Sequence, residues 1–292
     1  MFYTSKVSHR SAQMFGVLML CQLAACNLQK PQLLDALGPA PGALPPVTAS
    51  STCYNQPTGY TMAFDTPWNV LPALKPEWST EGYHFAAGQA STLSIVQVPE
   101  APKSAPNVLR IGFPRGFPGG GAPSRWGSRA LPQNHGEIYV CLWLRASSNF
   151  SNNGNVGTKL FFIRDSLNNH FIGLGISNKP TDLFPGTGLQ FRDNSKSYNL
   201  GQNVTAANRI DGGQWHKLEI IWRANTPGLR DGSYRQWVDD VLVSRSDQVL
   251  FFLAGQTPQW TYLWFDPTFG GGRNPVPNDQ YLDFDHLFVS VR

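Results

Sequence analysis

Short runs of alternating apolar and polar residues, each closed by turn-forming residues, recur from residue 53 to the end of the chain. Successive side chains of a β-strand point to opposite faces, so this alternation predicts strands that are buried on one face. No stretch after residue 52 repeats apolar residues at helical spacing over a useful length. We therefore expect β-sheets, and the 28 Gly and 23 Pro residues supply the turns that many short strands need.

Eight segments carry the strand pattern most clearly. They are Val108–Phe113, Glu137–Arg145, Lys159–Ile163, Phe171–Ile176, Leu189–Arg192, Trp215–Arg223, Tyr234–Val243 and Tyr281–Val291. Many strands with tight turns and no helices predict an all-β fold of two packed antiparallel sheets, a β-sandwich of the jelly-roll type.

Two of these segments allow a more detailed prediction. In Trp215–Arg223 the alternation assigns His216, Leu218, Ile220 and Trp222 to one face and Lys217, Glu219, Ile221 and Arg223 to the other. Asp239 and Asp240 stand between two apolar runs. Because aspartate tolerates a positive φ, this pair predicts a two-residue hairpin turn.

The first 25 residues have the composition of a secretory signal peptide. Lys6 and Arg10 come first, without any acidic residue, and an apolar run over residues 14–23 follows that is too short to remain as a membrane span. The run ends in Leu-Ala-Ala-Cys26, which resembles the lipobox of bacterial lipoproteins, where the cysteine thiol takes the lipid. We expect a lipidated Cys26 and an exported protein, anchored to the outer membrane or the periplasmic face. The alternative is an ordinary signal peptide and a secreted protein.

Residues 26–52 are rich in Pro, Ala and Ser and predict a flexible tether, followed by a single domain over residues 53–292. If Cys21 leaves with the signal peptide and Cys26 is acylated, Cys53 and Cys141 remain. In an oxidising compartment these two cysteines either form a disulfide with each other or remain as two buried thiols.

The charge balance restricts the class of partner. The whole chain carries +4, and removal of Lys6 and Arg10 with the signal peptide leaves +2. So mild a charge does not indicate a nucleic-acid partner. Contact with a membrane is expected through the lipid anchor only.

Three segments resemble strands of the concanavalin-A-like lectin and glucanase superfamily. They are Gly213-Gln-Trp-His-Lys-Leu-Glu219, Trp237-Val-Asp-Asp-Val-Leu-Val243 and Asp283-Phe-Asp-His-Leu-Phe-Val-Ser290. The resemblance spans roughly residues 60–292 and implies a concanavalin-A-like jelly roll.

A narrower resemblance is to polysaccharide lyases of the alginate and glucuronan type, families 14 and 20. The strand Val108–Ile111 with the Gly-rich loop at residues 114–121 looks like the opening of those domains, and Gly157-Thr-Lys-Leu160 is similar to their Gly-Gly-Lys-Leu strand. Gln190-Phe-Arg192 resembles the Ser-x-Arg strand of the family 14 enzymes, with Tyr198 near the place of a catalytic tyrosine. The resemblance implies β-elimination on a uronic-acid glycan.

β-Elimination needs a group that neutralises the sugar carboxylate, a base for the C5 proton and an acid for the leaving oxygen. Lys159, Gln190 and Arg192 are candidates for the first role, and Tyr198, His170 or Lys159 for the others. The alternative for Lys159 and Arg192 is a solvent-facing strand position, and for His170 an ordinary polar residue after a turn.

Glycoside hydrolysis is the least favoured enzyme reading. It usually needs two carboxyl groups across the scissile bond, and the five glutamates of the chain do not form the Glu-x-Asp-x-x-Glu run of jelly-roll glucanases.

Asp283 and Asp285 share a strand face by spacing, which indicates a structural pair or a weak cation site. No cofactor is expected, and a structural cation such as calcium stays open. A Gly-x-Ser-x-Gly elbow is absent, so serine esterase chemistry has no sequence support.

Carbohydrate binding without catalysis needs aromatic faces and a few hydrogen-bonding side chains in a groove. Five tryptophans are candidates, of which we expect most to lie in the core: Trp126, Trp222, Trp237, Trp260 and Trp264. Trp237 is the first choice because it shares a strand face with Arg235, a charge that is rarely buried.

The sequence thus predicts an exported lipoprotein whose jelly roll recognises an anionic polysaccharide, with Gln190, Arg235 and Trp237 as binding residues. The first alternative is a polysaccharide lyase with Lys159, Arg192, Tyr198 and His170 in its active site. The second is a non-catalytic envelope domain that is structural or binds another protein.

Overall fold

The computed structural model of the chain describes residues 53, 55–69, 92–121, 128–152, 157–164, 169–174, 183–190, 197–200, 209–270 and 274–292. The described residues contain no helix, and therefore no helix that is long and apolar enough to cross a membrane. Residues 169–174, 188–190 and 197–200 are placed through their backbone pairing alone. The expected signal peptide and tether, with Cys26, lie outside the described residues, as do Trp126 and Arg192.

Fourteen strands make up the described part of the chain. In chain order they are β1 (Thr61–Pro67), β2 (Leu93–Gln97), β3 (Asn107–Phe113), β4 (Ser128–His135), β5 (Glu137–Ala146), β6 (Thr158–Arg164), β7 (Asn169–Leu174), β8 (Pro185–Gln190), β9 (Ser197–Leu200), β10 (Trp215–Arg223), β11 (Gly232–Val238), β12 (Val241–Val249), β13 (Trp260–Phe269) and β14 (Gln280–Val291).

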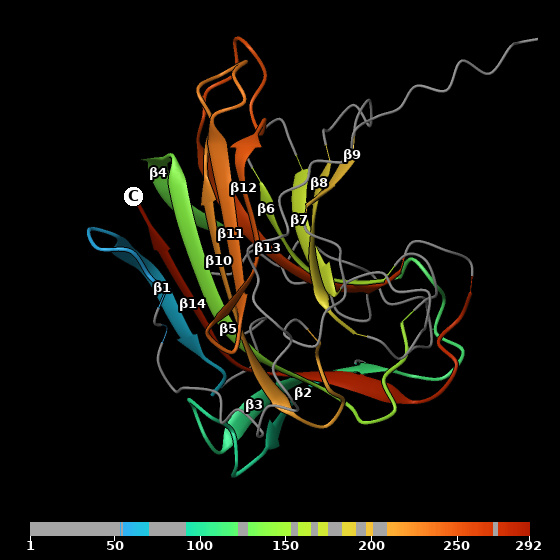
Figure 1. Cartoon of the computed structure of the whole chain (residues 1–292). Coiled ribbons are helices and arrows are strands. Elements are labelled where there is room, and N and C mark those ends of the chain that lie inside the picture. Colours follow the sequence, from blue (N-terminus) through green and yellow to red (C-terminus); the bar gives the residue numbers. More distant parts are fainter. Residues whose placement is uncertain are drawn as a thin grey trace, which may run out of the picture. The chain divides into compact units, whose positions relative to one another are not determined.

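The larger sheet has eight antiparallel strands, with the order β12-β11-β10-β5-β14-β3-β2 and β1 as an additional neighbour of β14 (Figure 1). β14 takes two neighbours along one edge because it is long: β3 pairs with residues 280–284 and β1 with residues 286–291. β5 runs along its other edge. The central strands β5 and β14 are thereby hydrogen-bonded on both sides.

The smaller sheet has six antiparallel strands in the order β4-β13-β6-β7-β8-β9. The two sheets pack face to face over one core, where Phe265 of β13 meets Phe284 of β14 with ring centroids 4.8 Å apart. Trp222 of β10 contacts Trp260 of β13 at 5.5 Å. Thr187 of β8 shares a 3.0 Å hydrogen bond with the Tyr234 hydroxyl of β11. The predicted two-sheet antiparallel sandwich is therefore confirmed.

The alternation predicted for Trp215–Arg223 is confirmed for its apolar face, because Leu218, Ile220 and Trp222 are buried in the core between the sheets. The single expected strand Tyr234–Val243 is two strands, β11 and β12, joined at Asp239 and Asp240. Both aspartates have a positive φ, of 48° and 71°. The hairpin turn lies where the sequence predicted it.

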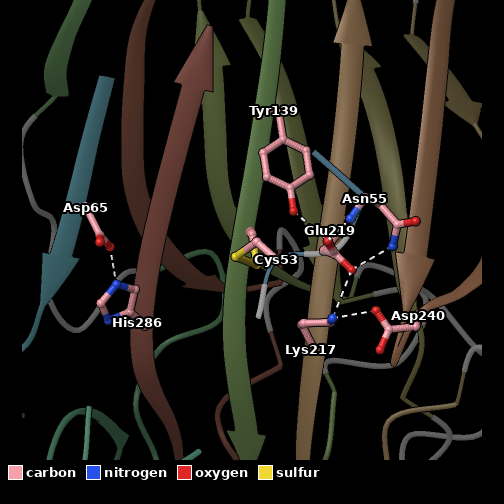
Figure 2. Close-up of a disulfide and its surroundings, with 9 residues drawn as sticks. Cys53, Asn55, Asp65, Tyr139, Lys217, Glu219, Asp240 and His286 are labelled. Carbon is pink, nitrogen blue, oxygen red and sulfur yellow. Dashed lines mark hydrogen bonds and ion pairs between the residues drawn. A yellow bond between two sulfur atoms is a disulfide. The ribbon is translucent and has the colours of Figure 1, made fainter. Parts of the chain in front are cut away.

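A disulfide joins Cys53 to Cys141, which is the first of the two alternatives that the sequence allowed for this pair (Figure 2). Cys141 lies on β5, on the face of the larger sheet that points away from the core, together with Tyr139 and Trp143. The segment after Cys53 crosses this face, and Asn55 bonds to Glu219 of β10 through its backbone N–H (2.9 Å) and its side-chain amide (2.8 Å). The disulfide thus fixes one end of a covering segment at the middle of the sheet.

Candidate functional site

The outer face of the six-stranded sheet gathers cations and aromatic rings on β6. Phe161 and Ile163 of this strand are buried in the core. Lys159, Phe162 and Arg164 lie on the opposite face, and both cations are only partly buried. The sheet therefore presents two positive charges on either side of one aromatic ring.

The neighbouring strand β13 adds two further rings to this face. Trp264 is directly opposite Phe162, and Tyr262 is opposite Arg164. The Arg164 guanidinium lies 3.5 Å from the centroid of the Trp264 ring and 5.0 Å from that of Phe162, while the Lys159 ammonium lies 6.0 Å from Phe162. Such cation–π contacts hold a guanidinium flat against the rings. Tyr262 is 41% exposed, so the cluster opens to solvent on this side.

The strand register extends this face across β7, β8 and β9. One row runs from Arg164 through Asn169 and Gln190 to Ser197, because each is paired directly with the next. Residues paired across antiparallel strands belong to the same face of a sheet. Gln190 thus lies in the same row of the sheet as Arg164.

Two predicted site residues fall in a different row. His170 is paired with Ile163 on one side and with Leu189 on the other, and Leu189 is paired with Tyr198. Ile163 is a core residue. The register therefore separates His170 and Tyr198 from the row of Arg164 and Gln190 and aligns them with a core position. Arg192 lies outside the described residues.

Arg235 and Trp237 lie on the other sheet. They belong to β11, where Tyr234, Gln236 and Val238 are buried toward the core and the alternate residues are partly exposed on the outer face. Arg235 pairs with Asp247 of β12 at 2.5 Å. A glycan on the outer face of the six-stranded sheet would therefore not meet Trp237, the tryptophan that the sequence favoured. Lys159 and Trp237 belong to different sheets.

The other described tryptophan candidates are all largely buried, and one of them contacts the cationic cluster. Trp222 and Trp260 are fully buried and stack on aromatic residues of the core. Trp264, with 9% of its surface exposed, is the described candidate that joins the cationic cluster. Sequence reasoning missed Arg164 altogether, although it directly follows the expected strand Lys159–Ile163 and continues its alternation from Phe162.

The two aspartates that suggested a weak cation site already have other partners. Asp283 is bonded by Arg110 and Arg145, and Asp285 accepts hydrogen bonds from the backbone N–H groups of Lys103 and Ser104. Among the described residues there is no group of three His, Cys, Asp or Glu side chains placed to bind a metal ion. Positively polarised donors therefore fill the positions around these carboxylates.

Ser104, His286 and Asp65 align in the order of a serine hydrolase triad. The Ser104 hydroxyl lies 2.5 Å from Nδ1 of His286. Nε2 of the same ring contacts the Asp65 carboxylate (Figure 2). Nucleophilic catalysis also needs donors for an oxyanion near the hydroxyl. The backbone N–H groups of Lys103 and Ser104 instead bond to Asp285, whose charge opposes an oxyanion. We interpret this group as a structural clamp between β14, β1 and the loop at 98–106.

A second polar group on the outer face of the larger sheet is buried under the segment that follows Cys53. Lys217 and Glu219 are fully buried, with 3.3 Å between Nζ and Oε2, and Lys217 also contacts Asp240 (Figure 2). The Tyr139 hydroxyl donates to Glu219 over 2.5 Å. Burial and the nearby Glu219 carboxylate raise the pKa of Tyr139 far above its ordinary value, so the hydroxyl stays protonated. This group is closed to a polymer and stabilises the sheet.

Several polysaccharide lyases are among the solved structures that this chain resembles. The endo-β-1,4-glucuronan lyase of the fungus Trichoderma reesei matches with a TM-score of 0.50 and 11% identity, over 80% of this chain and 96% of that one. An alginate lyase from a Chlorella virus matches with a TM-score of 0.48 and 12% identity, over 69% and 90% of the two chains. The family 14 alginate lyase of Aplysia kurodai gives 0.45 and 15%, over 69% and 87%.

No protein-family model matches the sequence, and no curated protein matches it either. At these identities the glucuronan lyase comparison establishes the fold and leaves the activity to be argued from the residues. The chain has a jelly-roll fold like that of the glucuronan lyase, as the sequence resemblance implied.

Proposed function

We propose that this domain binds a uronic-acid polysaccharide on the outer face of its six-stranded sheet and cleaves it by β-elimination. The observation that carries the proposal is the cluster of Lys159 and Arg164 with Phe162 and Trp264, two cations held among aromatic rings on a sheet face. Beside them the exposed ring of Tyr262 offers an apolar face to a sugar, and the cations complement the sugar carboxylates. The fold supports the same proposal, since structurally similar chains include a glucuronan lyase.

Arg164 and Gln190 neutralise the uronate carboxylate in this proposal. A neutralised carboxylate makes the C5 proton more acidic, because the charge that develops on the sugar in the transition state is stabilised. Arg192 remains a proposed third member of this group. The carboxylate binding step thus draws on one row of the sheet, from Arg164 to Gln190.

Lys159 is the proposed proton-transfer residue. Of the three candidates that the sequence offered for this step, Lys159 lies on the same face as Arg164, whereas His170 and Tyr198 share the row of Ile163. Lys159 acts from its neutral amine form and takes the C5 proton, and the electron pair of the C5–H bond forms the C4=C5 double bond as the C4–O bond breaks. The Lys159 ammonium formed in this way then passes the proton to the departing oxygen.

The test is the rise in absorbance near 235 nm, roughly where unsaturated uronates absorb, on incubation with alginate and glucuronan. We expect Lys159→Ala to lower kcat by at least about 100-fold and Arg164→Ala to lower kcat/KM by about 10- to 100-fold. Arg245→Ala, which removes an exposed cation from β12 of the other sheet, is the matched control and should retain activity. Absence of any rise on these polymers rejects the lyase proposal.

A second candidate, binding without cleavage, is favoured by the register of His170 and Tyr198 away from the cationic row. Affinity electrophoresis separates the two. Retardation by an acidic polymer without any absorbance change would support binding alone, and Trp264→Ala should weaken it. Trp237→Ala, on the outer face of the other sheet, should leave mobility unchanged.

An envelope location follows from the sequence only, and we propose it on that basis. The lipobox-like Leu-Ala-Ala-Cys26 supports export and lipidation, with residues 26–52 as the tether. Mass spectrometry of the mature N-terminus tests this proposal. An acyl mass on Cys26 supports a lipoprotein, and an unmodified Cys26 supports ordinary secretion.

A further inference from the structure

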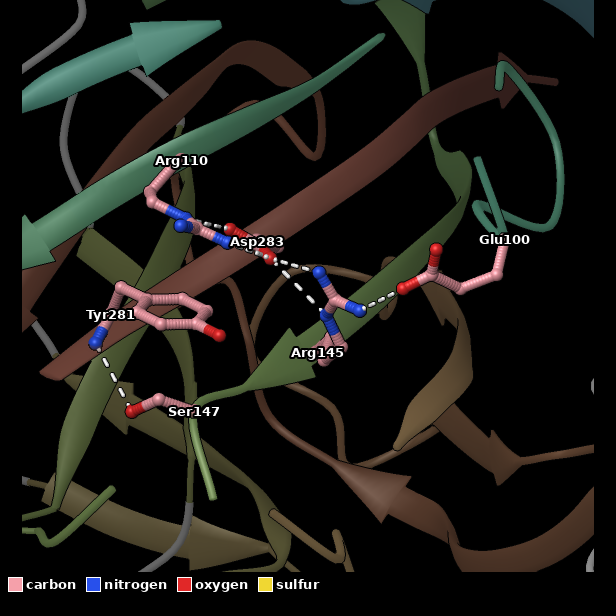
Figure 3. A network of polar contacts seen from close by, with 6 residues as sticks. All are labelled: Glu100, Arg110, Arg145, Ser147, Tyr281 and Asp283. Atoms are coloured by element: carbon pink, nitrogen blue, oxygen red, sulfur yellow. Dashed lines mark hydrogen bonds and ion pairs between the residues drawn. The ribbon is translucent and has the colours of Figure 1, made fainter. Parts of the chain in front are cut away.

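Two arginines lie on either side of one buried aspartate on the outer face of the eight-stranded sheet (Figure 3). Asp283 of β14 is paired in register with Arg110 of β3 on one side and Arg145 of β5 on the other. Arg110 reaches Asp283 with Nε at 2.7 Å and Nη2 at 2.9 Å. Arg145 reaches it with Nη2 at 2.7 Å and Nε at 3.2 Å. One carboxylate thus serves two guanidinium groups.

The second negative charge of this group comes from a loop. Glu100, in the turn after β2, accepts a 2.7 Å hydrogen bond from Nη1 of Arg145. The Glu100 side chain is 63% exposed, whereas the Arg145 side chain is 12% exposed and Asp283 is buried. The Glu100 carboxylate is therefore in water on most of its surface. Such ion pairs are weak and exchange readily with other anions.

Aromatic rings hold both guanidinium groups in place. The Arg110 guanidinium lies 3.7 Å from the centroid of the Tyr281 ring, and that of Arg145 lies 4.9 Å from the Trp215 ring. Because Asp283 and the rings already order these side chains, a carboxylate that binds them pays little entropy to arrange its partners. Arginine also suits this role because its planar donors match carboxylate geometry.

We infer that Arg145, with Arg110, forms a carboxylate-binding site for a uronate of an acidic glycan, and that Glu100 acts as a tethered competitor within it. The incoming carboxylate replaces Glu100 at Nη1 of Arg145, so the net charge of the group is unchanged. The choice of a uronate rests on the function proposed above. The site itself is separate from Lys159, since it belongs to the other sheet of the sandwich.

The consequence for a long polymer is a second point of attachment. While one stretch of a glycan is bound on the outer face of the six-stranded sheet, a distant stretch of the same polymer, or a neighbouring polymer chain, binds at Arg145. Two weak sites on one molecule raise the overall affinity for a polymer far more than for a monosaccharide. Such a site would retain the enzyme on its substrate between cleavage events.

The test follows the side-chain Nε–H signals of Arg110 and Arg145 by NMR during titration with glucuronate, with glucose as the neutral control. Glu100→Gln removes the competitor and leaves both arginines in place. We expect glucuronate to bind the variant up to about fivefold more tightly than the wild type, which corresponds to about 1 kcal/mol, the upper end for an exposed ion pair.

Asp247→Asn is the matched control, because the Arg235–Asp247 pair has the same 63% exposure of its carboxylate and lies on the same sheet. This variant also loses one negative charge, and its affinity at Arg145 should equal that of the wild type. Equal affinity of wild type and Glu100→Gln, equal shifts with glucose, or binding of polyglutamate in place of glucuronate would each overturn the inference. Repeating the titration in Lys159→Ala protein, where the signals should still shift, keeps this result independent of the lyase proposal.

Discussion

At the residue scale, Asp285 is an acid whose surroundings change its ionisation. The side chain is buried on β14 and accepts hydrogen bonds from the backbone N–H groups of Lys103 and Ser104. Burial raises the pKa of Asp285 above its ordinary value, and the two N–H groups offset part of that rise. The folded state therefore holds a proton on this group at a pH where the unfolded chain has released it.

This raised pKa predicts a specific dependence of stability on pH. Between the ordinary aspartate pKa and the raised one, the folded state binds more protons, so the contribution of Asp285 to the free energy of unfolding falls as pH rises. The free energy of unfolding of the wild type, minus that of Asp285→Asn, should decrease as pH rises across this window and stay constant above it. Urea denaturation at a series of pH values measures it. Parallel curves for the two proteins would contradict the prediction.

Lys159 illustrates at the same scale what a sequence cannot predict. Strict alternation along β6 assigns Lys159 to the face of Phe161 and Ile163, which is the core face. The register shifts between Lys159 and Phe161, so that Leu160 and Phe161 are both core residues and Lys159 joins Phe162 on the outer face. A bulge of this kind depends on the partner strand, here with a matching shift on β13. No local pattern in the sequence indicates it.

At the scale of elements, the hairpin between β11 and β12 was predictable because its signal is local. Asp239 and Asp240 both adopt the positive φ that two-residue turns require. Their side chains also reach β10: Asp239 accepts from the backbone N–H of Lys217 at 2.8 Å, and Asp240 contacts the Lys217 ammonium. The turn therefore has a tertiary role besides its backbone conformation.

These contacts predict that glycine is a poor replacement at position 240. Glycine would relieve about 1 kcal/mol of positive-φ cost. It would also remove one of the two carboxylates that the fully buried Lys217 contacts, at a cost of about 1–3 kcal/mol. We expect Asp240→Gly to lower the free energy of unfolding by about 1 kcal/mol in chemical denaturation. Asp240→Asn, which keeps the turn preference, is the control, and a glycine variant more stable than the wild type would refute the argument.

Other elements were harder to predict than this turn. Strands β1, β2, β4, β9 and β13 were not among those expected. Four of them (β1, β2, β4 and β9) are paired on one side only. Of these strands β13 matters most for the candidate site, because it contains Trp264.

The candidate site was partly predictable, because Lys159 and Gln190 follow from motif resemblance. Trp264 was one of five tryptophan candidates, and Arg164 was not a candidate. The pairing of β6 with β13, a long-range contact, is what brings these two residues together.

At the scale of the whole molecule, the Cys53–Cys141 disulfide closes a long loop. The two cysteines are 88 residues apart in sequence, so the bond removes many conformations from the unfolded chain. We expect the Cys53→Ala/Cys141→Ala variant to lose about 2–4 kcal/mol of unfolding free energy relative to the oxidised protein. Thermal and urea unfolding with and without reductant measure the effect. Reductant should not change the double variant, and an unchanged wild type under full reduction would count against the prediction.

The sandwich also distributes its candidate binding groups over two outer faces. Lys159 and Arg164 belong to the six-stranded sheet, and Arg110 and Arg145 to the eight-stranded sheet. Spacing along the chain does not distinguish the two sheets, so the sequence did not separate these residues. Sheet membership is decided by strand order, which is a property of the complete fold.

The position of Cys141 on a central strand has a mechanical consequence. Tension applied to the chain ahead of Cys53 enters the domain through a covalent bond to β5, which is hydrogen-bonded to β10 on one side and β14 on the other. The load then shears two full strand interfaces at once, and it bypasses β1, which would otherwise be peeled away first. In a protein anchored by its N-terminal end and bound to a moving polymer, this linkage resists unfolding by the resulting tension.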